Sequence, residues 1–200
     1  MKKTIILFFI SALSSIGYAQ EANKQKELGI TFNSLYSYGI AYKTGTATEL
    51  WRFNTVYGAL DRSTRTFDSL TQKNINNGIG LSIGREGRNK VANKVELRYG
   101  FDVNFRYSNY QQTSDYTNNS ANSSRKLVQY TPGLGLIFGF NYLINENLIL
   151  GAEILPTIGY NLSNETITNS NGTKNNFKTK GVTLSGINNN MALITLACRF

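Results

Sequence analysis

Residues 94–107 constrain the fold of this chain more than any other stretch. They read KVELRYGFDVNFRY, with an apolar or aromatic residue at every odd position and a charged, polar or glycine residue at every even position. Successive side chains of a β-strand point to opposite faces, so this period of two predicts a strand with one apolar and one polar face. A helix would scatter both sets of residues around its axis.

The length of this strand favours a membrane-spanning sheet. Strands of globular proteins usually run to about 5–6 residues. The fourteen residues here, at about 3.4 Å each, extend over roughly 48 Å. When tilted by about 40°, such a strand still crosses an apolar band of about 25 Å. Its polar face includes Glu96, Arg98, Asp102 and Arg106, which fits the polar interior of a transmembrane barrel.

Further stretches repeat the alternation and predict the rest of the sheet. Strands are expected at residues 28–43, 48–59, 75–86, 127–142, 148–161 and 192–200, with a weaker candidate at 177–187. Pro132 lies within one of them and suggests an edge-like position or a bulge. The polar segments 60–74, 108–126 and 163–176 are predicted to be surface loops, and the short segment 87–93 a turn.

The predicted fold class is all-β: an up-and-down antiparallel transmembrane β-barrel of eight strands. One conflict stands in the strand count, because bacterial single-chain barrels have an even number of strands. If the chain end and the turn at Asn145 face the same side, the stretches above give an odd number. The count becomes even if residues 28–43 contain two short strands, or if residues 177–187 pair differently.

The two faces of the predicted barrel carry two candidate sets of residues. Seven charged residues at inward positions are predicted to form an ion-pair network that fills the lumen: Arg52, Glu86, Glu96, Arg98, Asp102, Arg106 and Glu153. Seven aromatic residues are predicted to form girdles at the membrane interfaces, where amphipathic rings are favoured: Tyr42, Trp51, Tyr57, Tyr107, Tyr130, Tyr142 and Tyr160.

The first residues predict export from the cytoplasm. Lys2 and Lys3 precede a short apolar run, and small residues follow up to Ala19. This pattern predicts a signal peptide over residues 1–19 and a barrel domain over residues 20–200. Removal of Lys2 and Lys3 lowers the formal net charge from +9 to +7. The remaining basic residues form no cluster, which argues against nucleic acid as a partner.

The chain as a whole resembles the family of small outer-membrane β-barrel domains, within the OmpA-like group. The resemblance rests on the signal peptide, the alternating strands, the Asn- and Ser-rich loops and the terminal Phe200. It implies an eight-stranded barrel in the cell outer membrane, in contact with outer-membrane lipid, with no defined activity. The last strand resembles the C-terminal signal that the barrel assembly machinery reads, through Ala192, Ile194, Leu196, Cys198 and Phe200.

The residue inventory limits catalysis. The chain has no histidine, which excludes Ser-His-Asp triads, histidine bases and histidine metal sites. Cys198 is the single cysteine and lies on the expected lipid face, where it serves as a small apolar side chain. Paired carboxylates could perform acid–base chemistry, but with inward arginines an ion-pair network is the preferred interpretation. We therefore expect no enzyme activity, cofactor or metal.

These observations predict an integral outer-membrane protein with a structural or surface-interaction role. An eight-stranded barrel has room for side chains and little room for water. Phe67, Tyr110 and Tyr116 lie in the predicted loops, where they could contact a sugar or an extracellular partner. One alternative is a secreted, soluble lipocalin-like barrel with the two faces inverted and a small apolar ligand inside. Another is a narrow channel.

Overall fold

A computed structural model describes residues 24–34, 37–56, 60–117, 122–185 and 192–200. Its strands all belong to one antiparallel sheet. The strands are β1 (Gln25–Ser34), β2 (Ser37–Gly45), β3 (Glu49–Val56), β4 (Leu60–Phe67), β5 (Leu70–Ala92), β6 (Val95–Tyr116), β7 (Ser123–Leu143), β8 (Leu148–Ile154), β9 (Thr157–Thr168), β10 (Lys174–Ser185) and β11 (Ala192–Arg199). Within these described ranges, no helix has the length and apolar character needed to span a membrane.

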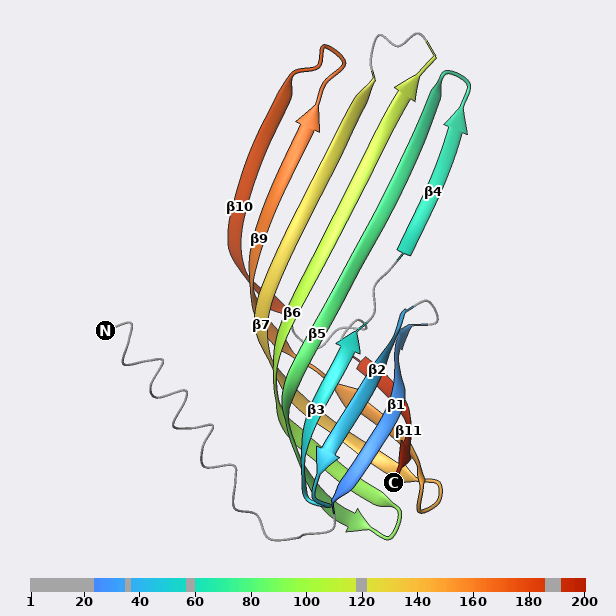
Figure 1. Cartoon of the computed structure of the whole chain (residues 1–200), viewed down its shortest axis with the longest axis vertical. Coiled ribbons are helices and arrows are strands. Elements are labelled where there is room, and N and C mark those ends of the chain that lie inside the picture. The colour runs from blue at the N-terminus through green and yellow to red at the C-terminus, as the bar shows by residue number, and fades with distance from the viewer. Residues whose placement is uncertain (1–23, 35–36, 57–59, 118–121, 186–191) are drawn as a thin grey trace, which may run out of the picture.

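Eight of the strands close into a ring, in the order β1, β2, β3, β5, β6, β7, β8 and β11 (Figure 1). Two sets of strand pairings close the ring. β11 pairs with β1, as in Leu28 with Cys198, and β8 pairs with both β11 and β7. This closed antiparallel ring confirms the predicted fold class and the predicted number of eight strands.

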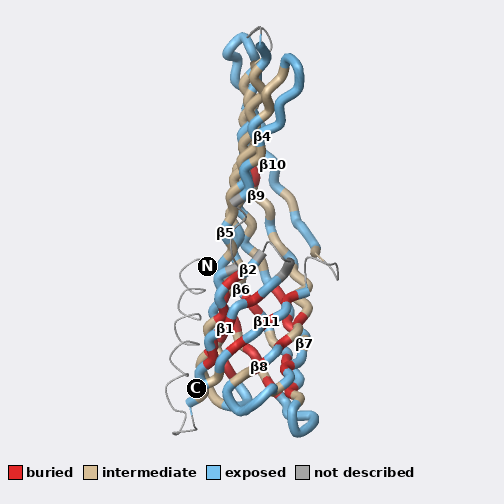
Figure 2. The backbone as a smooth tube through the Cα atoms, turned by 90° about the vertical axis from the view of Figure 1, so that its right-hand side faces the viewer, coloured by how far each residue is buried: buried red, intermediate tan, exposed pale blue. Residues whose placement is uncertain are grey.

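Above the ring, six strands continue as an open sheet in the order β4, β5, β6, β7, β9 and β10 (Figure 1). We call residues 60–77, 109–117, 122–128 and 161–180 the projecting sheet. β4 and β10 form its two edges. Figure 2 shows that the buried residues gather in the ring, whereas the projecting sheet is mostly intermediate or exposed.

The prediction of three surface loops is wrong, because most of the described residues in these segments form the projecting sheet. Residues 60–74 pair as the hairpin of β4 and β5, residues 108–116 and 123–126 lengthen β6 and β7, and residues 163–176 belong largely to β9 and β10. The predicted turn at 87–93 lies mostly within β5. Polar side chains occupy both faces of the projecting sheet, so the alternation that marks a half-buried strand is absent there.

Two features of the pairing resolve the conflict in the strand count. Residues 28–43 hold two strands, β1 and β2, which pair closely up to Ser34 and Ser37. β8 and β9 keep a single register against β7 across Pro156, from Phe138 with Ile154 to Gly135 with Thr157. The chain therefore rises and falls an even number of times. The start of β1 and the end of β11 meet at one end of the ring, where Lys26 N donates to Phe200 O at 2.9 Å.

Pro132 lies neither at a sheet edge nor at a bulge, contrary to the expectation from sequence. It pairs with Phe105 on the β6 side. On the β9 side, the register at Tyr130 with Leu162 is the same as at Gly133 with Gly159, and the pairing is interrupted between them. Because proline has no backbone N–H, the ladder loses hydrogen bonds there without shifting.

The two faces of the ring differ as the alternation predicts. Outward side chains on β6 are apolar and exposed, with Leu97 47 % and Phe101 56 % accessible, whereas the inward Arg98 is 1 % accessible. The outward positions become polar beyond Tyr107, beginning with Asn109. An apolar outer band around a polar interior suits lipid outside and charge inside. A soluble, lipocalin-like barrel requires the opposite arrangement.

Candidate functional site

Ten charged side chains meet inside the ring, and we call them the lumen cluster. They are five acids and five bases, so their formal charges balance: Glu27, Glu86, Glu96, Asp102 and Glu153, with Lys43, Arg52, Arg88, Arg98 and Arg199. Most of them are almost inaccessible to solvent. Charges removed from water in this way are stable only when paired and hydrogen-bonded.

Glu86 is the centre of the lumen cluster and is fully buried. Its Oε2 atom lies 2.9 Å from Lys43 Nζ and 2.8 Å from Arg98 Nη2. Arg88 Nε donates to Oε1 at 2.7 Å, and Arg52 Nη1 donates to Oε2 at 3.2 Å. Four cations thus surround one carboxylate. Three of them come from β2, β3 and β6, so their contacts with Glu86 hold these strands in place relative to β5.

The other acids of the lumen cluster tie these cations to the rest of the ring. Arg52 Nη2 lies 2.7 Å from Glu153 Oε1, and Arg88 Nη2 lies 2.6 Å from Glu27 Oε2. At the end where the first and last strands meet, Arg199 Nη2 lies 2.9 Å from Glu96 Oε2. The pairs connect strands on all sides of the lumen, so the lumen cluster links the walls of the ring to one another.

Inward glycines make room for these long side chains in a narrow ring. A Cβ at Gly151 would lie 2.9 Å from Arg98 Nη1 and from Asn141 Oδ1. A Cβ at Gly139 would lie 2.7 Å from Glu153 Cβ and even closer to the carbonyl oxygen of Ala152. An eight-stranded barrel has an interior just wide enough for its side chains. The small residues therefore allow the charged residues to meet.

Six of the seven predicted network residues lie together in the lumen cluster: Arg52, Glu86, Glu96, Arg98, Asp102 and Glu153. Arg106 does not join them. It is exposed and makes no ion pair with any described residue. Arg106 pairs with Gly80 of β5, and Gly80 pairs with Val56 of β3. Arg106 thus lies four residues beyond Asp102 on the inner face of β6.

Four members of the lumen cluster were missed from sequence: Glu27, Lys43, Arg88 and Arg199. Each follows the same alternation as its neighbours. Glu27 lies just before the predicted first strand, and Arg88 lies in the stretch that was predicted to be a turn. Lys43 and Arg199 already lay at inward positions of the predicted strands 28–43 and 192–200, and extending the neighbouring strands by a few residues would have placed Glu27 and Arg88 there too.

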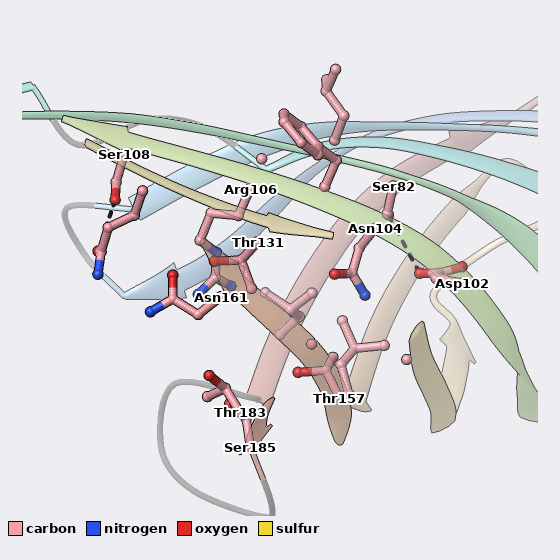
Figure 3. Close-up of a pocket in the computed structure, with 18 residues that line it drawn as sticks. Ser82, Asp102, Asn104, Arg106, Ser108, Thr131, Thr157, Asn161, Thr183 and Ser185 are labelled. Carbon is pink, nitrogen blue, oxygen red and sulfur yellow. Dashed lines mark hydrogen bonds between the residues drawn. The ribbon is translucent and has the colours of Figure 1, made fainter. Parts of the chain in front are cut away.

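Beyond the lumen cluster the lumen widens into a cavity of about 260 Å³, which we call the polar cup (Figure 3). It is lined by residues of β5, β6, β7, β9, β10 and β11, among them Asp102, Asn104, Arg106, Thr131, Thr157 and Asn161. Asp102 belongs to both structures, because Arg52 Nε lies 3.3 Å from its Oδ1 atom. The polar cup therefore adjoins the lumen cluster at Asp102.

The aromatic residues predicted for the girdles lie in two groups on the outer face. Tyr42 and Trp51 lie near the turn between β2 and β3, where Arg85 stacks 5.5 Å over the Trp51 ring. Tyr142 lies near the turn between β7 and β8. Tyr107 and Tyr130 lie where the outer face turns polar, with ring centroids 5.4 Å apart. Tyr160 is exposed on the neighbouring strand β9. Tyr57 lies outside the described residues.

The strand expected to carry the assembly signal is β11, which closes the ring by pairing with β1 and β8. Its outward residues are exposed: Ala192, Ile194, Leu196, Cys198 and the following Phe200. Cys198 is a free thiol. The described residues include no group of three or more His, Cys, Asp or Glu side chains arranged to hold a metal ion. The expected signal peptide at 1–19 lies outside the described residues.

A closed antiparallel ring with a charged interior and an apolar outer band defines a membrane-spanning β-barrel of the porin-like class. The chain belongs to the family described as "Putative OmpA-OmpF-like porin family", which matches residues 68–184. It is accordingly a protein of the cell outer membrane. No curated protein matches the chain.

Two solved structures are similar to this fold. One is a major outer membrane protein from Thermus thermophilus, with 11 % identity and a TM-score of 0.48 over 88 % of this chain and 99 % of that one. The other is CarO from Acinetobacter baumannii, with 11 % identity and a TM-score of 0.36 over 88 % of this chain and 95 % of that one.

Proposed function

We propose that this protein is a closed, non-conducting outer-membrane barrel that presents its projecting sheet to a partner outside the cell, and that it is not an enzyme. The observation that carries this proposal is the lumen cluster. Its side chains fill the ring from Glu27 and Arg199 at one end to Asp102 at the other. A continuous water path would require several buried ion pairs to separate.

The energetics of the lumen cluster favour a permanent plug over a channel. Separating one buried partner from another leaves an uncompensated charge, which costs about 3–5 kcal/mol. Glu86 alone contacts four cations, so its release would cost more than one such contact. A narrow channel is the alternative, and it requires a lumen that stays open at equilibrium.

The same pairing argues against catalysis. The buried carboxylates of the ring are engaged by arginine or lysine side chains. A general acid or base must exchange a proton with a substrate within hydrogen-bond reach. The chain also has no histidine. These features support a structural role for the carboxylates.

The projecting sheet has the properties of a contact surface for an anionic partner. It carries eight Lys and Arg residues and four Asp and Glu residues. Lys174, Lys178 and Lys180 are exposed on its edge strand β10, and the rings of Phe67 and Phe177 are exposed in the same sheet. A basic surface attracts polyanions over about 8–10 Å at physiological ionic strength. An anionic surface polysaccharide fits this surface.

Conductance measurements test whether the barrel is closed. The chain is folded into a planar lipid bilayer and current is recorded at fixed voltage. The wild-type barrel is expected to give no steady conductance steps. A double variant, Arg52→Ser with Glu153→Ser, removes two large side chains while keeping the lumen neutral, and serves as the opened control. Steady steps from the wild type would overturn the closed-barrel proposal.

Binding measurements test the contact role separately. Dextran sulfate is the anionic probe and neutral dextran the comparison, each titrated against the folded chain in detergent. A variant with Lys174→Gln, Lys178→Gln and Lys180→Gln is expected to bind dextran sulfate more weakly. The matched control carries Lys26→Gln, Lys90→Gln and Lys94→Gln, three exposed lysines near the opposite end of the ring. Equal losses in both variants would contradict a role for the projecting sheet.

A further inference from the structure

The polar cup holds one cation, Arg106, that no carboxylate of the described residues neutralises. The lumen cluster beneath it is balanced, with five acids and five bases, and Arg106 lies outside that balance. Of the twelve carboxylates in the chain, all but Glu21 belong to described residues, and none of these pairs with Arg106. Figure 3 shows the Arg106 side chain reaching into the cavity beside Thr131 and Asn161.

An unpaired guanidinium at the mouth of a cavity is suited to bind an anion. Its planar fork offers parallel N–H donors that match a carboxylate or a phosphate. Hydroxyl and amide side chains surround it, including Ser108, Gln129 and Thr131. The partner that Arg106 lacks within the described part of the protein can therefore come from a bound molecule.

The polar cup also contains acceptors that need donors. The Oδ1 atom of Asn161 is buried and has no hydrogen-bond partner among the described residues, and Asp102 Oδ1 has only the ion pair with Arg52 Nε at 3.3 Å. The other oxygen of Asp102 accepts a hydrogen bond from Ser82 Oγ at 3.4 Å. Buried polar atoms are normally hydrogen-bonded, and an unsatisfied one in a cavity points to a missing donor. Hydroxyl groups on a ligand would supply such donors.

Charge and size narrow the class of ligand. Asp102 and Arg106 are four residues apart on one face of β6, which places their Cα atoms about 14 Å apart along the strand. One guanidinium neutralises one negative charge, so a single carboxylate at Arg106 leaves the cup neutral, whereas a dianion such as phosphate leaves an excess negative charge. The volume of about 260 Å³ is slightly below the range of about 300–1,000 Å³ for drug-sized ligands, so the molecule is small.

We infer that the polar cup binds a small hydroxylated monocarboxylate of the sugar-acid type, with its carboxylate on Arg106 and its hydroxyl groups on the acceptors toward Asp102. The lumen cluster closes the floor of the cup, so the ligand is held at the outer mouth of the ring. Such a ligand can be a free sugar acid or the sugar-acid end of a surface polysaccharide. The inference stands whether or not the projecting sheet binds a separate partner.

Calorimetric titration of the full chain, folded in detergent micelles, tests this inference. The probes are D-galacturonate, the neutral D-galactose and inorganic phosphate. Galacturonate is expected to bind saturably and more tightly than the other two. Arg106→Gln is expected to weaken galacturonate binding at least about tenfold, and Arg106→Lys to keep part of it. The control is Arg65→Gln, which changes an exposed arginine of β4 outside the cup.

The outcomes are distinct. Arg106 is exposed and makes no ion pair with the described residues, so its variants should fold, and a gel shift between unheated and boiled samples verifies this. Galactose or phosphate binding as tightly as galacturonate overturns the inference, as does an Arg106→Gln variant with unchanged affinity or the absence of saturable galacturonate binding. A trimer of galacturonate separates the sources: tighter binding than the monomer supports a polysaccharide end, and equal binding supports a free sugar acid.

Discussion

Arg52 and Glu153 form a two-pronged ion pair across the lumen, with Nη2 to Oε1 at 2.7 Å and Nη1 to Oε2 at 3.1 Å. Both side chains are 1 % exposed. Arg52 lies on β3 and Glu153 on β8, which are four strands apart in either direction around the ring. This single pair therefore joins opposite walls of the barrel. It therefore braces the ring across the lumen.

Removing one member of this brace should strongly destabilise the barrel. Arg52→Leu leaves Glu153 without its bidentate partner and removes a contact of Glu86 and of Asp102. An uncompensated charge then remains in a space with little water, and the expected loss is about 3–5 kcal/mol. Urea unfolding of the protein in lipid vesicles measures the change in the free energy of unfolding.

The matched comparison is Lys73→Leu in the projecting sheet. Lys73 Nζ lies 3.6 Å from Asp115 Oδ2, and the two side chains are 58 % and 43 % exposed. Water screens such a pair, so its loss should cost less than about 1 kcal/mol. If Arg52→Leu cost no more than this exposed control, the lumen cluster would not be a stabilising brace.

The two sides of the brace should be energetically coupled. Arg52→Leu and Glu153→Leu each leave a charge of one sign unpaired, whereas the double variant keeps the lumen neutral. Contacting residues in one ion-pair network typically couple by about 0.5–3 kcal/mol. The double variant should therefore lose less stability than the two single variants together. A double-mutant cycle from urea unfolding measures this, and strict additivity would count against a shared network.

A charged substitution in the apolar outer band should cost more stability the closer it lies to the bilayer midplane. On β6 the apolar outward run extends from Val95 to Tyr107, so Val103 lies near its middle and Leu97 nearer one end. Val103→Arg should cost about 2–4 kcal/mol, and Leu97→Arg less, because the penalty falls from the bilayer midplane toward the interface. Unfolding in vesicles of defined lipid composition measures both.

A third arginine substitution serves as the control for facing. Ser124 lies on β7 in the projecting sheet, paired with Thr113, beyond the apolar run. Ser124→Arg should change stability little, because water surrounds that part of the sheet. An equal cost at Ser124 and Val103 would mean that the penalty comes from the strand and not from lipid.

Much of the ring could be predicted from sequence because lipid and lumen impose different residues on alternate positions. Val103 and Asp102 are neighbours in the chain, but Val103 faces lipid and Asp102 faces the lumen. The sequence shows this contrast directly as an apolar residue beside a charged one. The projecting sheet could not be predicted in this way. Thr113 and Ser114 also point to opposite faces of a strand, but both faces meet water, and their polar composition suggested a loop.

The lumen cluster was partly predictable for the same reason. Alternation places Arg98 and Asp102 on the inner face, and it places Arg106 there too. It does not tell which inward residues find a partner. Arg98 is buried and pairs with Glu86 and Glu153. Arg106 lines the polar cup and makes no ion pair with a described residue.

The glycines of the inner wall give the last prediction. A Cβ at Gly139 would lie 2.7 Å from Glu153 Cβ and against the carbonyl oxygen of Ala152, so the backbone of β8 would have to move. Overpacking of this kind costs about 1–3 kcal/mol. Gly139→Ala should thus lower the free energy of unfolding and shift Glu153 from Arg52.

The matched control is Gly181→Ala. A Cβ at Gly181 on β10 meets nothing within 4 Å, and this substitution should be neutral or slightly stabilising, because it restricts the unfolded chain. Urea unfolding of both variants in the same lipid decides the comparison, and equal stability would mean that the plug tolerates a wider wall than the structure implies.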